Sequence, residues 1–94
     1  MKIAIIGAGN VGGTLGAAWA NRGHEVFFGV RDAADPKLKE LLARTSGKAR
    51  AATVSDAVVP AEVVALTVPW PAAQDALRTA GDLGGKVLLD CTNP

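Results

Sequence analysis

The chain has 94 residues, of which 49% are hydrophobic and 20% charged, with a net charge of +1. This length predicts one domain spanning residues 1–94, and the near-neutral charge gives no electrostatic reason to expect nucleic acid or an anionic membrane as a partner. No run of roughly 20 apolar residues predicts a membrane span, and the N-terminal apolar run is too short for a signal peptide. The single cysteine, Cys91, excludes an internal disulfide and suggests a cytoplasmic location.

Predicted strands and helices alternate along the chain. Residues 2–6 lack polar alternation beyond Lys2, which predicts a strand buried on both faces, as in a parallel sheet covered by helices. The elements expected after it are a helix from 10 to about 22, a strand over 25–29, a helix from 35–36 to 46–47, a weak strand over 49–53, a short helix over 55–59, a strand over 62–68, a helix over 72–80 and a strand over 86–90. This order predicts an α/β fold, a Rossmann-like doubly wound parallel sheet of five strands in the order 3-2-1-4-5.

Local signals mark where two of these helices begin and end. Asn10 is expected to cap the first helix, and Gly23 to follow its last turn. Asp35–Pro36 is typical of the start of the second helix, and Ser46–Gly47 of its end.

Gly7, Gly9 and Gly12 form a G-x-G-x-x-G pattern between the first strand and the first helix. In a dinucleotide-binding turn, the first glycine permits the tight turn, the second leaves room for a pyrophosphate, and the third lets the helix pack closely on the strand. The helix N-terminus then offers unpaired N–H groups to the phosphates. This context favours a dinucleotide site over a purely structural turn, and Gly13 and Gly16 are expected to permit close helix packing.

The residues after the second strand bear on which dinucleotide binds. A carboxylate there would bind an adenosine ribose, whereas an arginine accommodates a 2′-phosphate. Val30 is not acidic and Arg31 offers a planar group suited to phosphate, which favours NADP over NAD. Asp32 keeps NAD open, because it is an acid within reach of the ribose. Lys37 could add a second cation, although a solvated helix residue is its expected role.

With these residues, the chain resembles the N-terminal domain of NADP oxidoreductases that use the deazaflavin coenzyme F420. The likeness covers nearly all of the sequence and includes Gly23–Val26 before the second strand, Val68–Trp70 after the fourth, and Leu89–Pro94 at the end of the fifth. The same domain type is shared with proteins resembling pyrroline-carboxylate reductases and metalloreductases.

The resemblance implies a set of cofactor-binding residues. Gly9, Asn10 and Val11 would line the phosphates, Arg31 would hold the 2′-phosphate beside Val30, which stands where the family has serine, and Val68 and Pro69 would lie near the nicotinamide. Together with the glycine turn, the expected set is Gly7, Ala8, Gly9, Asn10, Val11, Gly12, Val30, Arg31, Val68 and Pro69.

No residue is assigned a catalytic role, because in hydride transfer the cofactors carry the chemistry and the protein supplies position. His24 is expected in a surface turn at the opposite strand end, Cys91 as a buried inert thiol, and Trp19 in helix packing. Trp70 either packs or stacks on a ligand ring. No residue combination suggests a metal site.

The sequence therefore predicts the NADP(H)-binding domain of an oxidoreductase that transfers hydride between NADP(H) and a deazaflavin, flavin or other small acceptor. The alternatives are a nucleotide-binding or sensing module without catalysis, and an NAD-linked reductase of another small substrate. Full-length family members carry further residues after the fifth strand, which help to hold the acceptor and often form a homodimer. The chain is thus expected to be a fragment or an isolated cofactor module.

Overall fold

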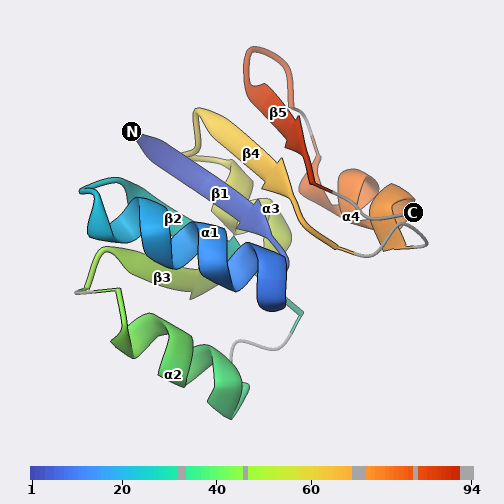
Figure 1. Ribbon diagram of the computed structural model, residues 1–94. Coiled ribbons are helices and arrows are strands. Elements are labelled where there is room, and N and C mark those ends of the chain that lie inside the picture. The colour runs from blue at the N-terminus through green and yellow to red at the C-terminus, as the bar shows by residue number, and fades with distance from the viewer. Residues whose placement is uncertain (32–33, 46, 69–71, 82, 92–94) are drawn as a thin grey trace.

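Five parallel strands form the centre of the molecule, in the order β3-β2-β1-β4-β5 (Figure 1). The computed structural model describes residues 1–31, 34–45, 47–68, 72–81 and 83–91. The strands are β1 (Lys2–Ile6), β2 (Glu25–Gly29), β3 (Ala49–Ala52), β4 (Val63–Leu66) and β5 (Val87–Asp90). The helices are α1 (Asn10–Asn21), α2 (Pro36–Ala43), α3 (Val54–Val58) and α4 (Ala73–Ala80). The predicted α/β class and strand order are confirmed.

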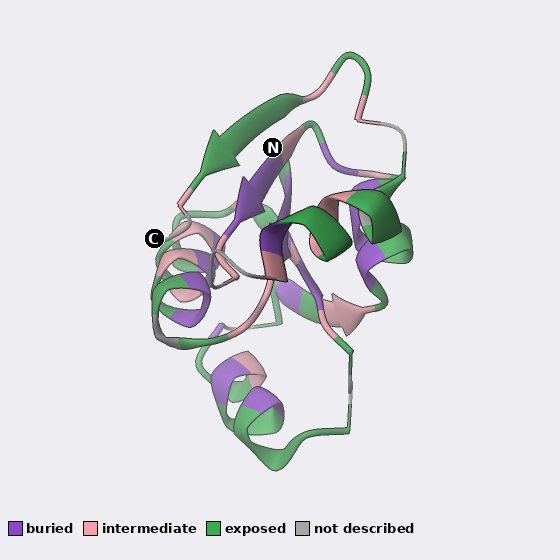
Figure 2. Ribbon diagram, turned by 90° about the vertical axis from the view of Figure 1, so that its right-hand side faces the viewer, coloured by how far each residue is buried: buried purple, intermediate pink, exposed green. Residues whose placement is uncertain are grey.

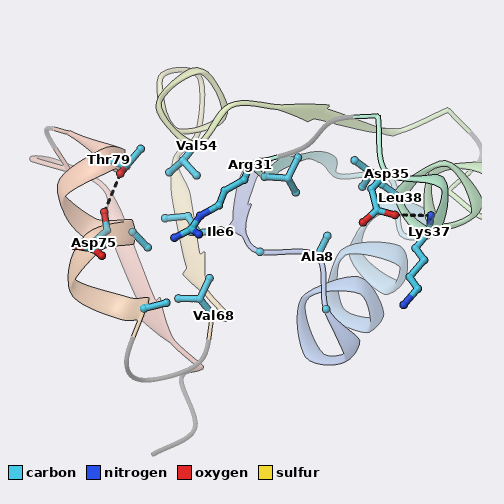
Figure 3. A pocket seen from close by; sticks show the side chains of 16 residues that line it. Ile6, Ala8, Arg31, Asp35, Lys37, Leu38, Val54, Val68, Asp75 and Thr79 are labelled. Carbon is cyan, nitrogen blue, oxygen red and sulfur yellow. Dashed lines mark hydrogen bonds between the residues drawn. The ribbon is translucent and has the colours of Figure 1, made fainter.

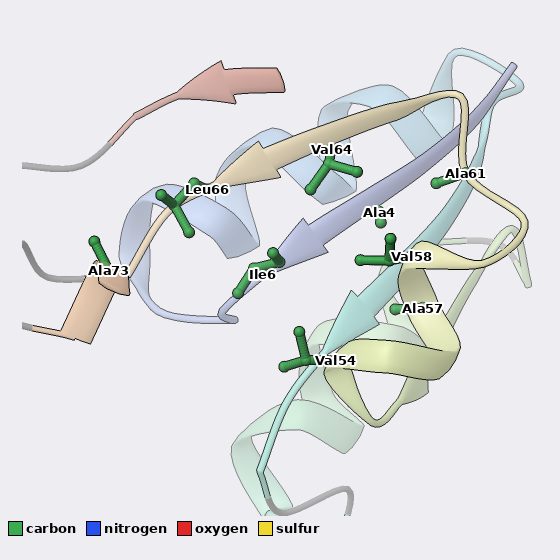
Figure 4. Packing of buried hydrophobic residues seen from close by; sticks show 9 residues of the cluster. All are labelled: Ala4, Ile6, Val54, Ala57, Val58, Ala61, Val64, Leu66 and Ala73. Atoms are coloured by element: carbon green, nitrogen blue, oxygen red, sulfur yellow. The ribbon is translucent and has the colours of Figure 1, made fainter. Parts of the chain in front are cut away.

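Helices cover both faces of this sheet, which explains why β1 is apolar throughout. Ile3 and Ile5 belong to a cluster packed against α1 and α2, whereas Ala4 and Ile6 belong to a second cluster with residues of α3 and α4 (Figure 4). Side chains alternate between the faces of a strand, so a strand covered on both sides needs no polar positions.

The last strand is an exception to this burial. Figure 2 shows β5 as an exposed strand at the edge of the sheet. Val87, Leu88 and Leu89 are 57%, 45% and 39% exposed, although their chain order and pairing with β4 match a Rossmann sheet. The apolar residues of this segment therefore predict that β5 is a strand, but they do not predict that it is exposed.

The start of α1 differs from the prediction. Gly9, not Asn10, is the N-cap, and its backbone is extended (φ −75°, ψ −162°). The Gly13 N–H donates to the Gly9 carbonyl at 2.7 Å, so the helical hydrogen bonds begin one residue earlier than Asn10 capping would require. Gly23 follows the helix with φ +97°, as predicted.

The second helix begins as predicted and ends early. Asp35 is its N-cap, with Pro36 in the first turn. It ends at Ala43, before the predicted end at Ser46–Gly47, because the Arg44 and Thr45 N–H groups turn back to carbonyls three residues earlier, at 3.1 Å each. Ser46 lies outside the described residues. Similarly, β4 is shorter than the predicted strand over 62–68.

The N-cap of α2 yields a stability prediction. An Asp35 carboxylate oxygen accepts a hydrogen bond from the Lys37 N–H at 2.9 Å. Asp35→Ala should lower the free energy of unfolding by about 1 kcal/mol, because this N–H loses its partner. Asp35→Asn, which still caps, should remain near wild type. Thermal unfolding of both variants checks this, and equal melting temperatures for the alanine and asparagine variants would contradict it.

Within the described residues, no helix is both long and apolar enough to cross a membrane; α1, the longest, has 12 residues.

Candidate functional site

The glycine turn between β1 and α1 has the geometry that its sequence predicts. Gly7 has φ +106°, a conformation that side-chain-bearing residues rarely adopt, and its N–H donates to the Gly29 carbonyl at 3.0 Å. A Cβ on Gly7 would lie 3.0 Å from the Thr67 hydroxyl oxygen. The turn is therefore held against both neighbouring strands, β2 through Gly29 and the end of β4 through Thr67.

Gly9 and Gly12 face opposite environments. A Cβ on Gly12 would lie 2.5 Å from Thr67 Oγ1 and 2.9 Å from the Gly7 carbonyl oxygen, so α1 packs against the turn as closely as glycine allows. A Cβ on Gly9 would meet nothing within 4 Å. Packing within the protein thus requires glycine at position 12, whereas the open space at Gly9 is available to a ligand.

Other glycines have packing roles. A Cβ on Gly16 would collide with the Phe28 ring, as expected for close helix packing, whereas one on Gly13 would make ordinary contact with Leu41 at 3.4 Å. Gly29 has a packing role that the sequence did not predict: a Cβ there would lie 2.9 Å from the Val54 Cα. The sequence feature that could have identified Gly29 is its position at the end of β2, directly before the residues expected to contact the ribose.

A pocket of about 720 Å³ opens at the carboxyl ends of the strands (Figure 3). Six of the ten expected cofactor residues line it: Gly7, Ala8, Gly9, Val30, Arg31 and Val68. Figure 3 shows the Arg31 side chain extending into the pocket, between the glycine turn and α4. The structure thus brings the glycine turn, the end of β2 and the residue after Thr67 to one cavity.

The remaining expected residues have other places. Gly12 is buried beneath the turn, and Val11 is 51% exposed on the first turn of α1. Asn10 is the first residue of α1. Pro69 lies outside the described residues, as do Asp32 and Trp70.

Sequence reasoning did not assign the opposite wall of the pocket. That wall includes Ala72, Asp75, Ala76 and Thr79, at or within α4. The available signal was the chain order, because a helix that follows β4 in a doubly wound sheet starts beside the carboxyl edge.

Four charged residues line the described part of the pocket: Arg31, Asp35, Lys37 and Asp75. Both carboxylates interact within their own helices. Asp35 caps α2, and Asp75 lies 3.8 Å from Arg78 in a highly exposed pair. Lys37, expected as a solvated residue, is exposed but lines the same pocket as Arg31. The Arg31 guanidinium points into the pocket toward α4, whereas Lys37 extends from α2 on the other side of the glycine turn (Figure 3), so Arg31 is the cation that makes the interior of the pocket suitable for an anionic group.

The start of α1 provides a second place for an anion. No side chain caps the described N-terminus, and its first turn contains no acidic residue. The first N–H groups of an α-helix lack intrahelical partners, and the helix dipole favours negative charge there. Phosphate oxygens would therefore fit at the open face of Gly9.

None of the residues His24, Cys91 and Trp19 lines this pocket. His24 precedes β2 at the opposite strand end, as expected. Cys91 follows β5 and is only partly buried, not fully buried as expected. Trp19 packs against the cluster beneath α1, as expected.

The described ranges contain no group of three His, Cys, Asp or Glu residues that could hold a metal ion.

Known proteins with similar sequences indicate the family of this chain. The family model described as NADP oxidoreductase, coenzyme F420-dependent, matches residues 2–94. The F420-dependent NADP reductase of Methanothermobacter marburgensis is 40% identical over the whole of this chain and 45% of its own length. This chain thus spans less than half the length of that relative.

Solved structures share the fold. A candidate F420-dependent NADP reductase from Arthrobacter sp. FB24 superposes with a TM-score of 0.88 at 35% identity, over 100% of this chain and 46% of that one. An imine reductase from Myxococcus stipitatus in complex with NADP+ has a TM-score of 0.82 at 27% identity, over 100% of this chain and 32% of that one.

Proposed function

Because the chain belongs to the family of coenzyme F420-dependent NADP oxidoreductases, we propose that it is the NADP(H)-binding domain of an oxidoreductase that passes hydride between NADP(H) and a deazaflavin acceptor. The observation that carries this proposal is the single pocket that joins the open face of Gly9 to Arg31. These are the two places where a phosphorylated dinucleotide presents its negative charge.

Each end of the pocket has a separate task in this proposal. At the glycine turn, the free N–H groups at the start of α1 bind the pyrophosphate, which approaches closely because Gly9 has no side chain. At the end of β2, the Arg31 guanidinium binds the 2′-phosphate. The NADP+ complex of the Myxococcus stipitatus imine reductase supports this choice of cofactor.

A bound nicotinamide supplies the hydride chemistry, and the protein's task is to position it. Val68 lines the pocket just after the end of β4, on the α4 side of the glycine turn. We assign Val68 and Pro69 to the nicotinamide end, where apolar contact would orient the ring without donating a proton. The deazaflavin acceptor is supported by the names of the curated relatives, F420-dependent NADP reductases.

Parallel titrations with NADPH and NADH, followed by tryptophan fluorescence, test the cofactor assignment. We expect NADPH to bind at least about tenfold more tightly, a difference of about 1.4 kcal/mol. Equal affinities, or tighter NADH binding, would overturn it and favour Asp32 as a ribose ligand.

Mixing the protein with NADPH and oxidised F420 tests the acceptor, with F420 reduction followed by absorbance. A second arm with free flavin mononucleotide distinguishes a deazaflavin from a flavin acceptor. The alternative of a non-catalytic binding module predicts NADPH binding without transfer to either acceptor, also in a protein that carries the residues expected to hold the acceptor.

A further inference from the structure

Thr67 occupies an unusual position beneath the glycine turn. It follows Leu66, the last residue of β4, and precedes Val68, which lines the pocket. It is partly buried and lies 61 positions from Ile6, the residue that leads into the turn. Neither the G-x-G-x-x-G pattern nor the expected cofactor residues include it.

Two hydrogen bonds join Thr67 to one carbonyl group. The Thr67 hydroxyl donates to the Ile6 carbonyl oxygen at 2.9 Å, and the Thr67 N–H donates to the same oxygen at 3.1 Å. The backbone bond would exist with any residue except proline, whereas the second bond requires a hydroxyl. Thr67 thus adds a side-chain bond at the point where β1 becomes the turn.

The same hydroxyl fits the space that two glycines leave. A Cβ on Gly7 would lie 3.0 Å from Thr67 Oγ1, and a Cβ on Gly12 would lie 2.5 Å from it. The hydroxyl is therefore confined on one side by its bond to Ile6 and on the other by the backbone of the turn. Close packing of this kind transmits small displacements, because no void is left to absorb them.

We infer that Thr67 is a positioning residue, whose hydroxyl sets the shape of the glycine turn and so the direction of the N–H groups at the start of α1. This role rests on the proposed binding of a pyrophosphate at that turn. Loss of the hydroxyl leaves the Ile6 carbonyl with one bond fewer and removes the contact beneath Gly7 and Gly12. The 2′-phosphate end at Arg31 follows β2, and the hydrogen bond of the Thr67 hydroxyl goes to Ile6 of β1 instead, so a ligand that uses only Arg31 should be less sensitive to the loss of that hydroxyl.

The test compares two ligands that use the two ends differently. NADP+ carries both the pyrophosphate and the 2′-phosphate, whereas adenosine 2′-monophosphate carries only the latter. Thr67→Val should weaken NADP+ binding about tenfold and change adenosine 2′-monophosphate binding less than twofold. Thr67→Ser, which keeps the hydroxyl, should retain most of the NADP+ affinity. Thr67→Ala, which adds no bulk, should behave like Thr67→Val and serves if the valine variant does not fold.

Thr45→Val is the matched control. The Thr45 hydroxyl also donates to a backbone carbonyl, that of Leu42 at 2.6 Å, but in a buried site after α2. This variant should lower the melting temperature without changing the affinity for either ligand.

If the Thr67 variants lose stability while the ratio of the two affinities stays at the wild-type value, Thr67 is only structural and the inference is wrong. If wild-type protein binds adenosine 2′-monophosphate but gains nothing from the pyrophosphate of NADP+, the positioning role fails as well. If it binds neither ligand, the proposed function itself fails.

Discussion

Replacing Gly9 with aspartate is expected to lower NADPH affinity at least about 100-fold, or about 2.7 kcal/mol, without reducing the stability of the fold. Gly9 is the N-cap of α1, and its φ of −75° is accessible to any residue. Aspartate is among the best N-cap residues, since its carboxylate accepts hydrogen bonds from the first helical N–H groups. Those are the groups proposed to bind the pyrophosphate, so the new carboxylate would both occupy them and repel the ligand.

Titration with NADPH and thermal unfolding of the same samples separate these effects. Gly13→Ala is the matched control, because it lies one turn further along α1 and its Cβ would make ordinary contact with Leu41 at 3.4 Å. It should leave NADPH affinity within twofold of wild type and raise stability slightly, since alanine favours a helix over glycine by up to about 1 kcal/mol. Normal NADPH binding by Gly9→Asp would place the pyrophosphate elsewhere. A large loss of stability would show that the space at Gly9 is not free for a side chain.

The parts of the fold that the sequence predicts well depend on local patterns. The uninterrupted apolar run of β1 indicates cover on both faces, and the two core clusters confirm it. The requirement for glycine at positions 7 and 12 also follows from the pattern, because strand, turn and helix must meet at close range there. The alternation of strands and helices then leaves few other topologies.

The features that the sequence does not predict depend on contacts between distant segments. Thr67 is a common residue at the end of a strand, and only the pairing of β1 with β4 shows that its hydroxyl meets Ile6 and the glycines. Gly29 is required by α3, which follows an intervening strand. Sequence patterns indicate periodicity and conformational preference, but they do not specify which atoms meet across a sheet.

The capping of α1 illustrates a different limit. Asparagine is a stronger N-cap former than glycine, so propensity favours Asn10. The structure places the cap at Gly9, because the tight turn at Gly7 directs the chain into the helix one residue earlier. The geometry of the turn thus overrides the local preference, and the N-terminus of α1 has no side-chain cap.

Arg31→Ala is expected to lower NADPH affinity at least about tenfold, or about 1.4 kcal/mol, and to leave NADH affinity within twofold. The reason is that NADPH and NADH differ only in the 2′-phosphate. Arg31 carries the guanidinium group of the described pocket lining and follows Gly29 and Val30, which also line the pocket. Hydrogen bonds between an arginine and a phosphate are charge-assisted and stronger than neutral ones. Arg31→Lys should recover only part of the affinity, because an ammonium group lacks the planar pair of donors.

The control for Arg31→Ala must remove the same charge from another place. Arg50→Ala does so, because Arg50 is an exposed residue of β3, and its loss changes the net charge of the chain equally. It should leave the preference for NADPH unchanged. Equal losses in the two variants would mean that Arg31 acts only through the overall charge. An unchanged NADPH affinity in Arg31→Ala would mean that Arg31 does not bind the 2′-phosphate. The binding role would then fall to Lys37, the other cation of the described pocket lining, and Lys37→Ala would test it.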